Sequence, residues 1–158
     1  MGSFGDSPTI MNILHLITIN AAILAAIFIS GCKTSEPLPD LGIEKIYFAK
    51  YVPPAELKQY EPINGSLSAG QKVYLVCRFT NSGAAVHGKW RIAYFIDDKQ
   101  VYSTIFGDFP AGRTQDPAGW WVPVTPGPHK YSCKLDPQNA IAESNKGNNS
   151  MTIPFDVK

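Results

Sequence analysis

The sequence has few of the residues on which most enzymes depend. It contains three histidines, and His15 falls in an apolar N-terminal segment. His87 and His129 are far apart in the sequence, and each lies beside turn residues. The sequence also contains no nucleophile elbow, no HExxH motif, no phosphate-binding glycine loop and no paired-carboxylate motif. We therefore expect no catalytic site, no metal and no cofactor, and we interpret both histidines as surface or packing residues.

A strong charge of one sign is also lacking. The 14 lysines and arginines nearly balance the 13 aspartates and glutamates, and the formal net charge is +1. So neutral a chain gives no reason to expect a nucleic acid partner or a surface patch held to acidic lipids by charge.

The apolar N-terminal segment, residues 13–29, has about the length of the hydrophobic region of a signal peptide. Its last residue begins the tetrapeptide Ile29-Ser30-Gly31-Cys32, which resembles a lipobox. At a lipobox, lipoprotein signal peptidase cuts before a cysteine that carries a diacylglyceryl thioether. The resemblance predicts a signal peptide over residues 1–31, a lipidated Cys32 and tether over residues 32–40, and a domain over residues 41–158.

Lys33 is the first basic residue of the chain, so the basic region that usually precedes such a segment is missing. An uncleaved membrane anchor and an ordinary secretory signal therefore remain as alternatives, and translation could begin at Met1 or Met11. All of these place the domain outside the cytoplasm. With a lipobox, we expect a fatty-acid anchor in a bacterial membrane, with the domain facing the periplasm or the cell surface.

Short strand-like stretches, separated by Gly, Pro, Asn and Asp, follow the tether. We expect about seven, over residues 43–49, 71–80, 89–96, 100–106, 120–124, 129–135 and 150–157. This spacing is typical of an all-β sandwich. In the last stretch apolar and polar residues alternate and Pro154 cannot donate to a ladder, so we expect a half-buried strand at a sheet edge. Residues 51–70 are expected to form a long connection with one short helical turn at residues 55–59.

If Cys32 is lipidated, Cys77 and Cys133 remain as a pair. Each lies in phase with the apolar residues of its strand, so both thiols should point into the core, where they form a disulfide or stay as two reduced, buried thiols. Trp90 and the triplet Tyr131-Ser132-Cys133 resemble the Cys…Trp…Tyr-x-Cys arrangement of immunoglobulin sandwiches, which implies an immunoglobulin-like fold and favours the disulfide.

The most specific motif lies between the last two predicted strands. Asp136-Pro137, Asn139, Ile141, Glu143, Asn145 and Asn148-Asn149 resemble the pattern Asp-Pro-x-Asn-x-(apolar)-x-Glu-x-Asn-x-x-Asn-Asn at the end of a CARDB domain. CARDB domains are small adhesion-type modules. The resemblance implies a β-sandwich that binds or spaces without catalysis, and it names no ligand. In the loop itself, Ile141 is expected to be the one apolar residue that fixes the loop to the core.

The same loop is rich in side-chain oxygens, and Ca²⁺ takes about six to eight oxygen ligands. The spacing matches no EF-hand, however, and only Asp136 and Glu143 are charged among the motif's side chains. We expect these groups to bind backbone amides within the loop, with a bound calcium ion as the alternative.

Trp120 and Trp121 are neighbours in a predicted strand, so only one of them can face the core. The other is the candidate contact residue, and Phe106 and Phe109 in the nearby loop region either join it in a contact patch or cover the core. The sequence thus predicts a non-catalytic module that binds an envelope protein or a glycan. The alternative is an accessory or structural subunit of an envelope complex, bound through the edge strand at residues 150–157.

Overall fold

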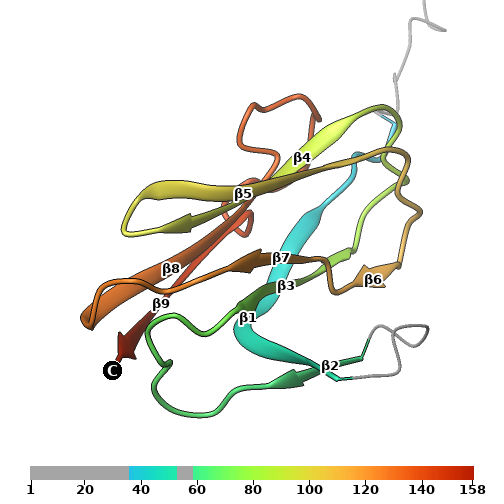
Figure 1. Ribbon diagram of the computed structural model, residues 1–158. Coiled ribbons are helices and arrows are strands. Elements are labelled where there is room, and N and C mark those ends of the chain that lie inside the picture. The colour runs from blue at the N-terminus through green and yellow to red at the C-terminus, as the bar shows by residue number, and fades with distance from the viewer. Residues whose placement is uncertain (1–35, 53–58) are drawn as a thin grey trace, which may run out of the picture. The chain divides into compact units, whose positions relative to one another are not determined.

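The computed structural model describes residues 36–52 and 59–158, so the predicted signal segment and Cys32 lie outside the described residues. The described part contains nine strands (Figure 1): β1 Leu41–Val52, β2 Gln59–Pro62, β3 Val73–Asn81, β4 Trp90–Ile96, β5 Lys99–Phe106, β6 Thr114–Gln115, β7 Ala118–Trp121, β8 Gly127–Leu135 and β9 Ser150–Val157. Within these ranges no helix is long and apolar enough to cross a membrane.

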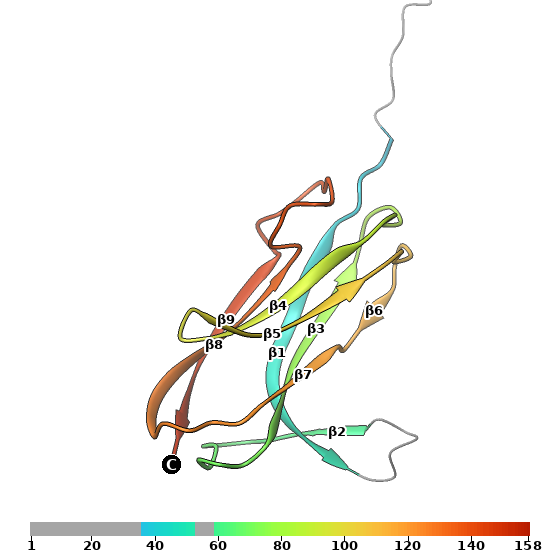
Figure 2. The same cartoon turned by 45° about the horizontal axis from the view of Figure 1, so that its top comes forward.

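The strands form two antiparallel sheets that pack face to face (Figure 2). Sheet A has the order β2-β1-β3, and β6 and β7 both pair with the far side of β3. Sheet B has the order β5-β4-β8-β9. The expected all-β sandwich is confirmed.

Alternation of side chains explains why these segments are strands. In β3, Val73, Leu75, Cys77 and Phe79 are fully buried, and in β4, Trp90, Ile92 and Tyr94 are at most 2% exposed. Residues two apart share one face of a strand, so each sheet turns one apolar face toward the other.

The number of strands differs from the expected seven, because two short ones were missed. β2 lies within the stretch that we expected to be a connection, and Gln59, which we placed in a helical turn, begins this strand instead. β6, only two residues long, lies between the strands that we expected at residues 100–106 and 120–124. Both are too short to show an alternating apolar pattern, which is the feature that marks a strand in sequence.

The backbone conformation or the close packing of two turns explains which residues occupy them. Asp97 and Asp98 connect β4 to β5 with φ angles of 48° and 65°, and aspartate tolerates this left-handed conformation, which a two-residue hairpin needs. After β3, the α-carbon of Gly83 lies so close to the chain before β1 that an added Cβ would sit 2.3 Å from the carbonyl oxygen of Leu38.

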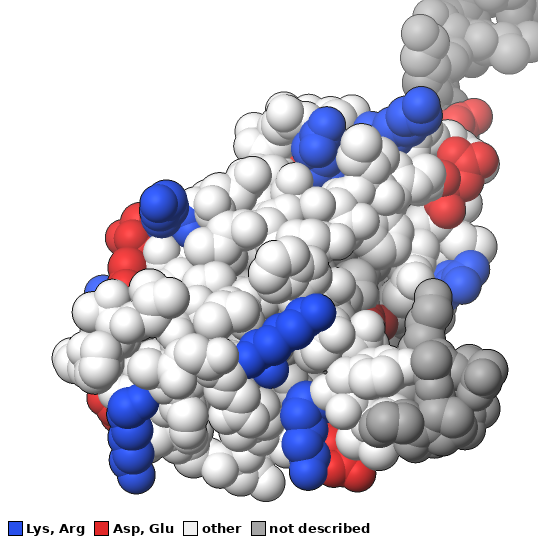
Figure 3. All heavy atoms as spheres, viewed as in Figure 1, with Lys and Arg blue, Asp and Glu red and all other residues white. Residues whose placement is uncertain are grey.

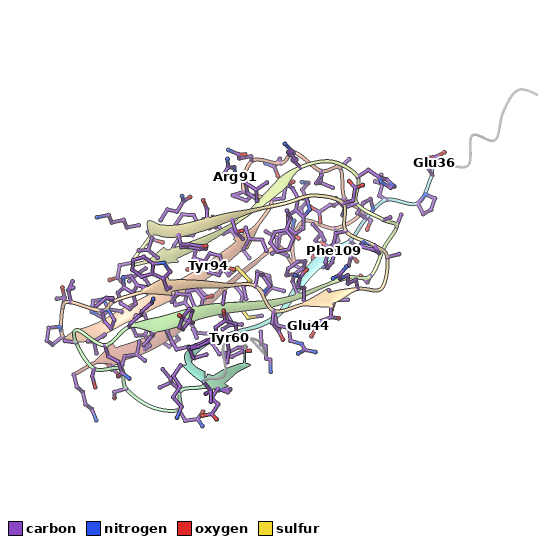
Figure 4. All side chains as sticks on the ribbon, turned by 45° about the vertical axis from the view of Figure 1, so that its right-hand side comes forward. Glu36, Glu44, Tyr60, Arg91, Tyr94 and Phe109 are labelled. Atoms are coloured by element: carbon purple, nitrogen blue, oxygen red, sulfur yellow. A yellow bond between two sulfur atoms is a disulfide. The ribbon has the colours of Figure 1, made fainter. Side chains whose placement is uncertain are left out.

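A disulfide joins the two sheets. It connects Cys77 of β3 to Cys133 of β8, and both residues are fully buried. Figure 4 shows it between the layers. Trp90 belongs to the same buried core, with its ring centre 5.5 Å from that of Phe79 and its indole N–H donating to the Gly107 carbonyl. The predicted bridge is therefore confirmed.

β9 is the edge strand of sheet B, as Pro154 indicated. The carbonyl of Asp156 accepts a hydrogen bond from Leu67, which lies on the side away from β8. Residues two apart direct their backbone groups to the same side of a strand, so Pro154 also faces outward. Its missing N–H therefore removes no bond from the β8–β9 ladder.

Candidate functional site

The adjacent tryptophans of β7 point to opposite faces of sheet A. Trp121 is half-buried and packs edge-on against Phe155, with ring centres 5.9 Å apart. Trp120 is 55% exposed, which places it among the few exposed large apolar side chains of the described residues. Trp120 is therefore the outward member of the pair.

Phe106 and Phe109 do not accompany Trp120. Phe109 is 2% exposed, and its ring centre lies 5.0 Å from that of Phe79. The ring centre of Phe106 lies 5.0 Å from that of Trp90. The recorded aromatic contacts of both phenylalanines are with Phe79, Trp90 and each other. Phe106 and Phe109 therefore do not join Trp120 in a contact patch. Of the two expected alternatives, the structure shows cover of the core, because Phe109 is buried in it and the partly buried Phe106 packs against it.

Three tyrosines lie on the same face of sheet A as Trp120. Trp120 stands directly opposite Tyr74 of β3, Tyr74 stands opposite Ala49 of β1, and Tyr51 of β1 stands opposite Tyr60 of β2. Directly paired residues share one face of a sheet, and so do residues two apart on a strand. All four aromatic side chains therefore lie on the face of sheet A that points away from the core. We call the set Tyr51, Tyr60, Tyr74 and Trp120 the aromatic row.

The three tyrosine rings of the row are in contact with one another. The centre of the Tyr60 ring is 5.0 Å from that of Tyr74, and Tyr51 lies 6.2 Å from Tyr74 and 6.3 Å from Tyr60. Burial raises the pKa of the Tyr60 hydroxyl above its usual value, and the neighbouring Tyr74 adds to the effect. The raised pKa keeps the Tyr60 hydroxyl protonated at neutral pH, so this group can donate a hydrogen bond.

Lys72, just before β3, supplies a positive charge to the row. Its ammonium nitrogen lies 5.1 Å from the centre of the Trp120 ring and 5.6 Å from that of Tyr74. A cation within about 6 Å of an aromatic face is attracted to it, so the lysine is held at this end of the row. On the face shown in Figure 3, lysine and arginine side chains are scattered over a mostly uncharged surface and do not gather into one patch.

The histidines have other roles. His87 is exposed, whereas His129 directs Nδ1 to Asp97 at 2.5 Å and Nε2 to the Thr125 carbonyl at 2.8 Å. Hydrogen bonding to Asp97 raises the pKa of His129, and the Thr125 carbonyl adds to the shift. With both ring nitrogens engaged, neither is free to take a proton from a nucleophile.

The loop over residues 136–149 mainly binds itself and the start of β1. Asp136 accepts from the backbone N–H groups of Ala140 and Ile141, and Glu143 accepts from that of Leu41. Ile141 is 9% exposed and belongs to the core, as expected. Within the part of the chain that the structure describes, no group of three or more His, Cys, Asp or Glu residues is placed to hold a metal ion.

Sequence reasoning missed the three tyrosines and Lys72. Tyr74 lies out of phase with the buried residues of its strand, so its outward direction could have been predicted from alternation alone. Tyr51 and Tyr60 gave no such signal, because their stretch looked like a connection. Only the pairing of β1 with β2 and β3 brings them to Tyr74.

Comparison with known proteins agrees with this architecture. The model of the CARDB family matches residues 38–153. None of the curated proteins matches the chain.

Two solved structures with a similar fold come from archaea. One is the crystal structure of a CARDB domain from Pyrococcus furiosus in complex with di-metal ions, with 16% identity, a TM-score of 0.60, and coverage of 76% of this chain and 94% of that one. Another is the solution structure of a domain from Methanosarcina acetivorans, with 15% identity, a TM-score of 0.56, and coverage of 77% and 93%. At this level of identity the likeness concerns the fold.

Proposed function

Because the chain belongs to the CARDB family of non-catalytic, adhesion-type modules, we propose that it is an exported lipoprotein whose domain holds a protein or glycan partner at a bacterial cell envelope. The lipobox-like residues before Cys32 support the lipid anchor, and residues 33–40 would serve as the tether. The aromatic row supports the binding role.

The exposed indole of Trp120 is the observation that carries the binding proposal. A tryptophan that is 55% exposed on a regular strand contributes little to the core of its own domain. At the centre of an interface, however, one desolvated aromatic side chain can be worth about 2 kcal/mol or more. Trp120 stands opposite Tyr74 on the same face of sheet A, and the Lys72 ammonium lies over its ring, so a partner at Trp120 would meet an aromatic surface that carries a positive charge.

The composition of the row favours a glycan over a protein. Aromatic rings offer flat apolar faces on which sugar rings stack, and the tyrosine hydroxyls and the Lys72 ammonium offer donors for sugar hydroxyls or carboxylates. The row runs across β7, β3, β1 and β2, which suits an extended chain of several sugar units. A protein partner is the competing outcome of the experiment below.

Binding through the edge strand is the second candidate, and the position of β9 at the edge of sheet B supports it. Only a short part of this edge is available for pairing with a partner strand. Leu67 already pairs with the end of the strand at Asp156 and Val157, and Pro154 presents no N–H. Among the residues facing outward, Ser150 and Thr152 retain both backbone groups, whereas strand addition gains its affinity from a continuous series of such bonds.

The experiment compares single substitutions in the full chain. Trp120→Ala should weaken capture on immobilised envelope polysaccharide at least tenfold, with little change in melting temperature. Ile105→Ala is the matched control, because it removes an equally exposed apolar side chain from β5. Thr152→Pro removes one outward N–H from β9 and should leave capture unchanged.

Three results would redirect the proposal. Loss of crosslinking to an envelope protein in Trp120→Ala, with no polysaccharide capture by the wild type, would assign the row to a protein. Loss of capture in Thr152→Pro alone would assign binding to the edge strand. Unchanged capture in Trp120→Ala would remove the row as the site.

A further inference from the structure

Two buried carboxylates lie in the loop that joins β8 to β9. The side chain of Asp136 is 1% exposed and that of Glu143 is 0% exposed. Besides the backbone groups named above, Glu143 accepts a hydrogen bond of 2.8 Å from the side-chain amide of Asn149. Two negative charges held this far from water need compensation by a cation as well as by hydrogen bonds.

The ammonium group of Lys146 supplies that cation from within the loop. Its nitrogen lies 2.8 Å from the Ile141 carbonyl, 3.2 Å from Oδ1 of Asn139, 3.4 Å from Oδ2 of Asp136 and 3.5 Å from Oε1 of Glu143. Among the described residues, no other basic side chain lies within 4.0 Å of either carboxylate. One ammonium is thus surrounded by four oxygens of four different residues.

A fifth oxygen of the same region has no partner. Asp136, Asn139, Lys146 and Asn149 line a cavity of about 250 Å³. Asn149 is 8% exposed, and its side-chain oxygen makes no hydrogen bond among the described residues. A buried acceptor without a donor, beside two carboxylates, is an arrangement that suits a cation.

We propose that residues 136–149 form a cation site whose occupant is the chain's own Lys146, and that removal of this ammonium turns the loop into a calcium site. The donor set is all oxygen and includes two carboxylates, which are the ligands that Ca²⁺ prefers. A small residue at position 146 would leave both the negative charge and the space for the ion, and water would complete its coordination.

The consequence concerns the junction between tether and domain. The loop holds the chain just before β1, because the backbone N–H of Ser144 donates to the Pro39 carbonyl at 2.9 Å and the side-chain amide of Asn148 donates to Oδ1 of Asp40 at 2.9 Å. Glu143 binds the N–H of Leu41 at 3.0 Å. With a lysine as the cation, this junction keeps its structure whatever the calcium concentration outside the cell.

The test measures thermal unfolding of the full chain in detergent, in excess EDTA and in millimolar calcium chloride. The wild type should melt at the same temperature in both solutions. Lys146→Ala should melt about 5 °C or more lower in EDTA and recover most of the loss in calcium. Lys146→Met should melt lower in both, because its apolar side chain fills the space without charge. Lys134→Ala, which removes a lysine lining the same cavity but not bound to either carboxylate, should behave like the wild type.

Calorimetric titration with calcium chloride should detect binding to Lys146→Ala and none to the wild type. A wild-type melting temperature that rises in calcium as far as that of Lys146→Ala would overturn the proposal, since the metal and not the lysine would then be the occupant. So would a Lys146→Ala variant as stable in EDTA as the wild type. A variant that gains nothing from calcium, or stays unfolded in both solutions, would show that the oxygens form no cation site.

Discussion

The phenol of Tyr131 donates a 3.0 Å hydrogen bond to the main-chain carbonyl of Val76, across the interior of the sandwich. Tyr131 is fully buried on β8, and Val76 belongs to β3. Val76 precedes Cys77, and Tyr131 stands two residues before Cys133. The hydrogen bond and the disulfide therefore tie the same two strands together at adjacent positions.

Replacement of Tyr131 by Phe should lower the free energy of unfolding by about 1 kcal/mol, because it removes this hydrogen bond and keeps the ring. Loss of the disulfide in Cys77→Ala/Cys133→Ala should cost roughly 4 kcal/mol on the chain-entropy model, given a separation of 56 residues. Denaturant unfolding of both variants and of their combination measures how strongly the two links are coupled. The combined loss should be at least about 0.5 kcal/mol smaller than the sum, since the sheets can move apart locally once the disulfide is gone.

Tyr47→Phe is the control for this series, because its ring is half-buried on the outer face and its hydroxyl makes no hydrogen bond among the described residues. Strictly additive losses would show that the hydrogen bond does not depend on the covalent link.

The parts of this structure that could be predicted are mainly those that follow from the alternation of apolar and polar residues along a strand. The inward positions of Cys77 and Cys133, the half-buried face of β9 and the opposite directions of Trp120 and Trp121 all follow from the two-residue period of a strand. The buried Ile141 follows from its isolation among polar residues. Each of these predictions needed only neighbours along the chain.

The parts that were missed depend on contacts between distant segments. Phe109 is buried because it pairs with Val86 and packs on Phe79, and neither contact can be inferred from a Gly- and Pro-rich loop sequence. Tyr60 reaches Tyr74 only through the pairing of β2 with β1. The position of Lys146 among four oxygens depends on the path of the whole loop, which no local period describes.

The interaction of His129 with Asp97 should make stability depend on pH. Both ring nitrogens face acceptors, and only the doubly protonated imidazolium can donate to both. Hydrogen bonding to Asp97 raises the pKa of His129 above its ordinary value of 6.5, and hydrogen bonding to His129 lowers the pKa of Asp97 below 3.8. The pair therefore stabilises the fold fully between pH 3.8 and 6.5, less as pH rises through the raised pKa of His129, and less as pH falls through the lowered pKa of Asp97.

An NMR titration should find the pKa of His129 above 6.5 in the wild type and lower in Asp97→Asn. The difference in unfolding free energy between wild type and His129→Gln should shrink as pH rises from that window toward alkaline values. A His129 pKa that does not respond to Asp97→Asn would contradict the assignment.

Lipidation of Cys32 is the prediction on which the proposed location depends. The thioether requires a sulfur atom, so Cys32→Ser should abolish labelling by a fatty-acid analogue and leave residues 1–31 attached, with a larger mass as the second sign. Lys33→Ala changes the neighbouring residue and keeps the thiol, so it should be labelled and cleaved like the wild type. Labelling of the serine variant would place the lipid on another residue. A membrane-bound wild type whose N-terminus lies upstream of Cys32 would replace the lipid anchor by an uncleaved apolar segment. Binding through the aromatic row does not depend on the kind of anchor, so the Trp120→Ala experiment tests it independently.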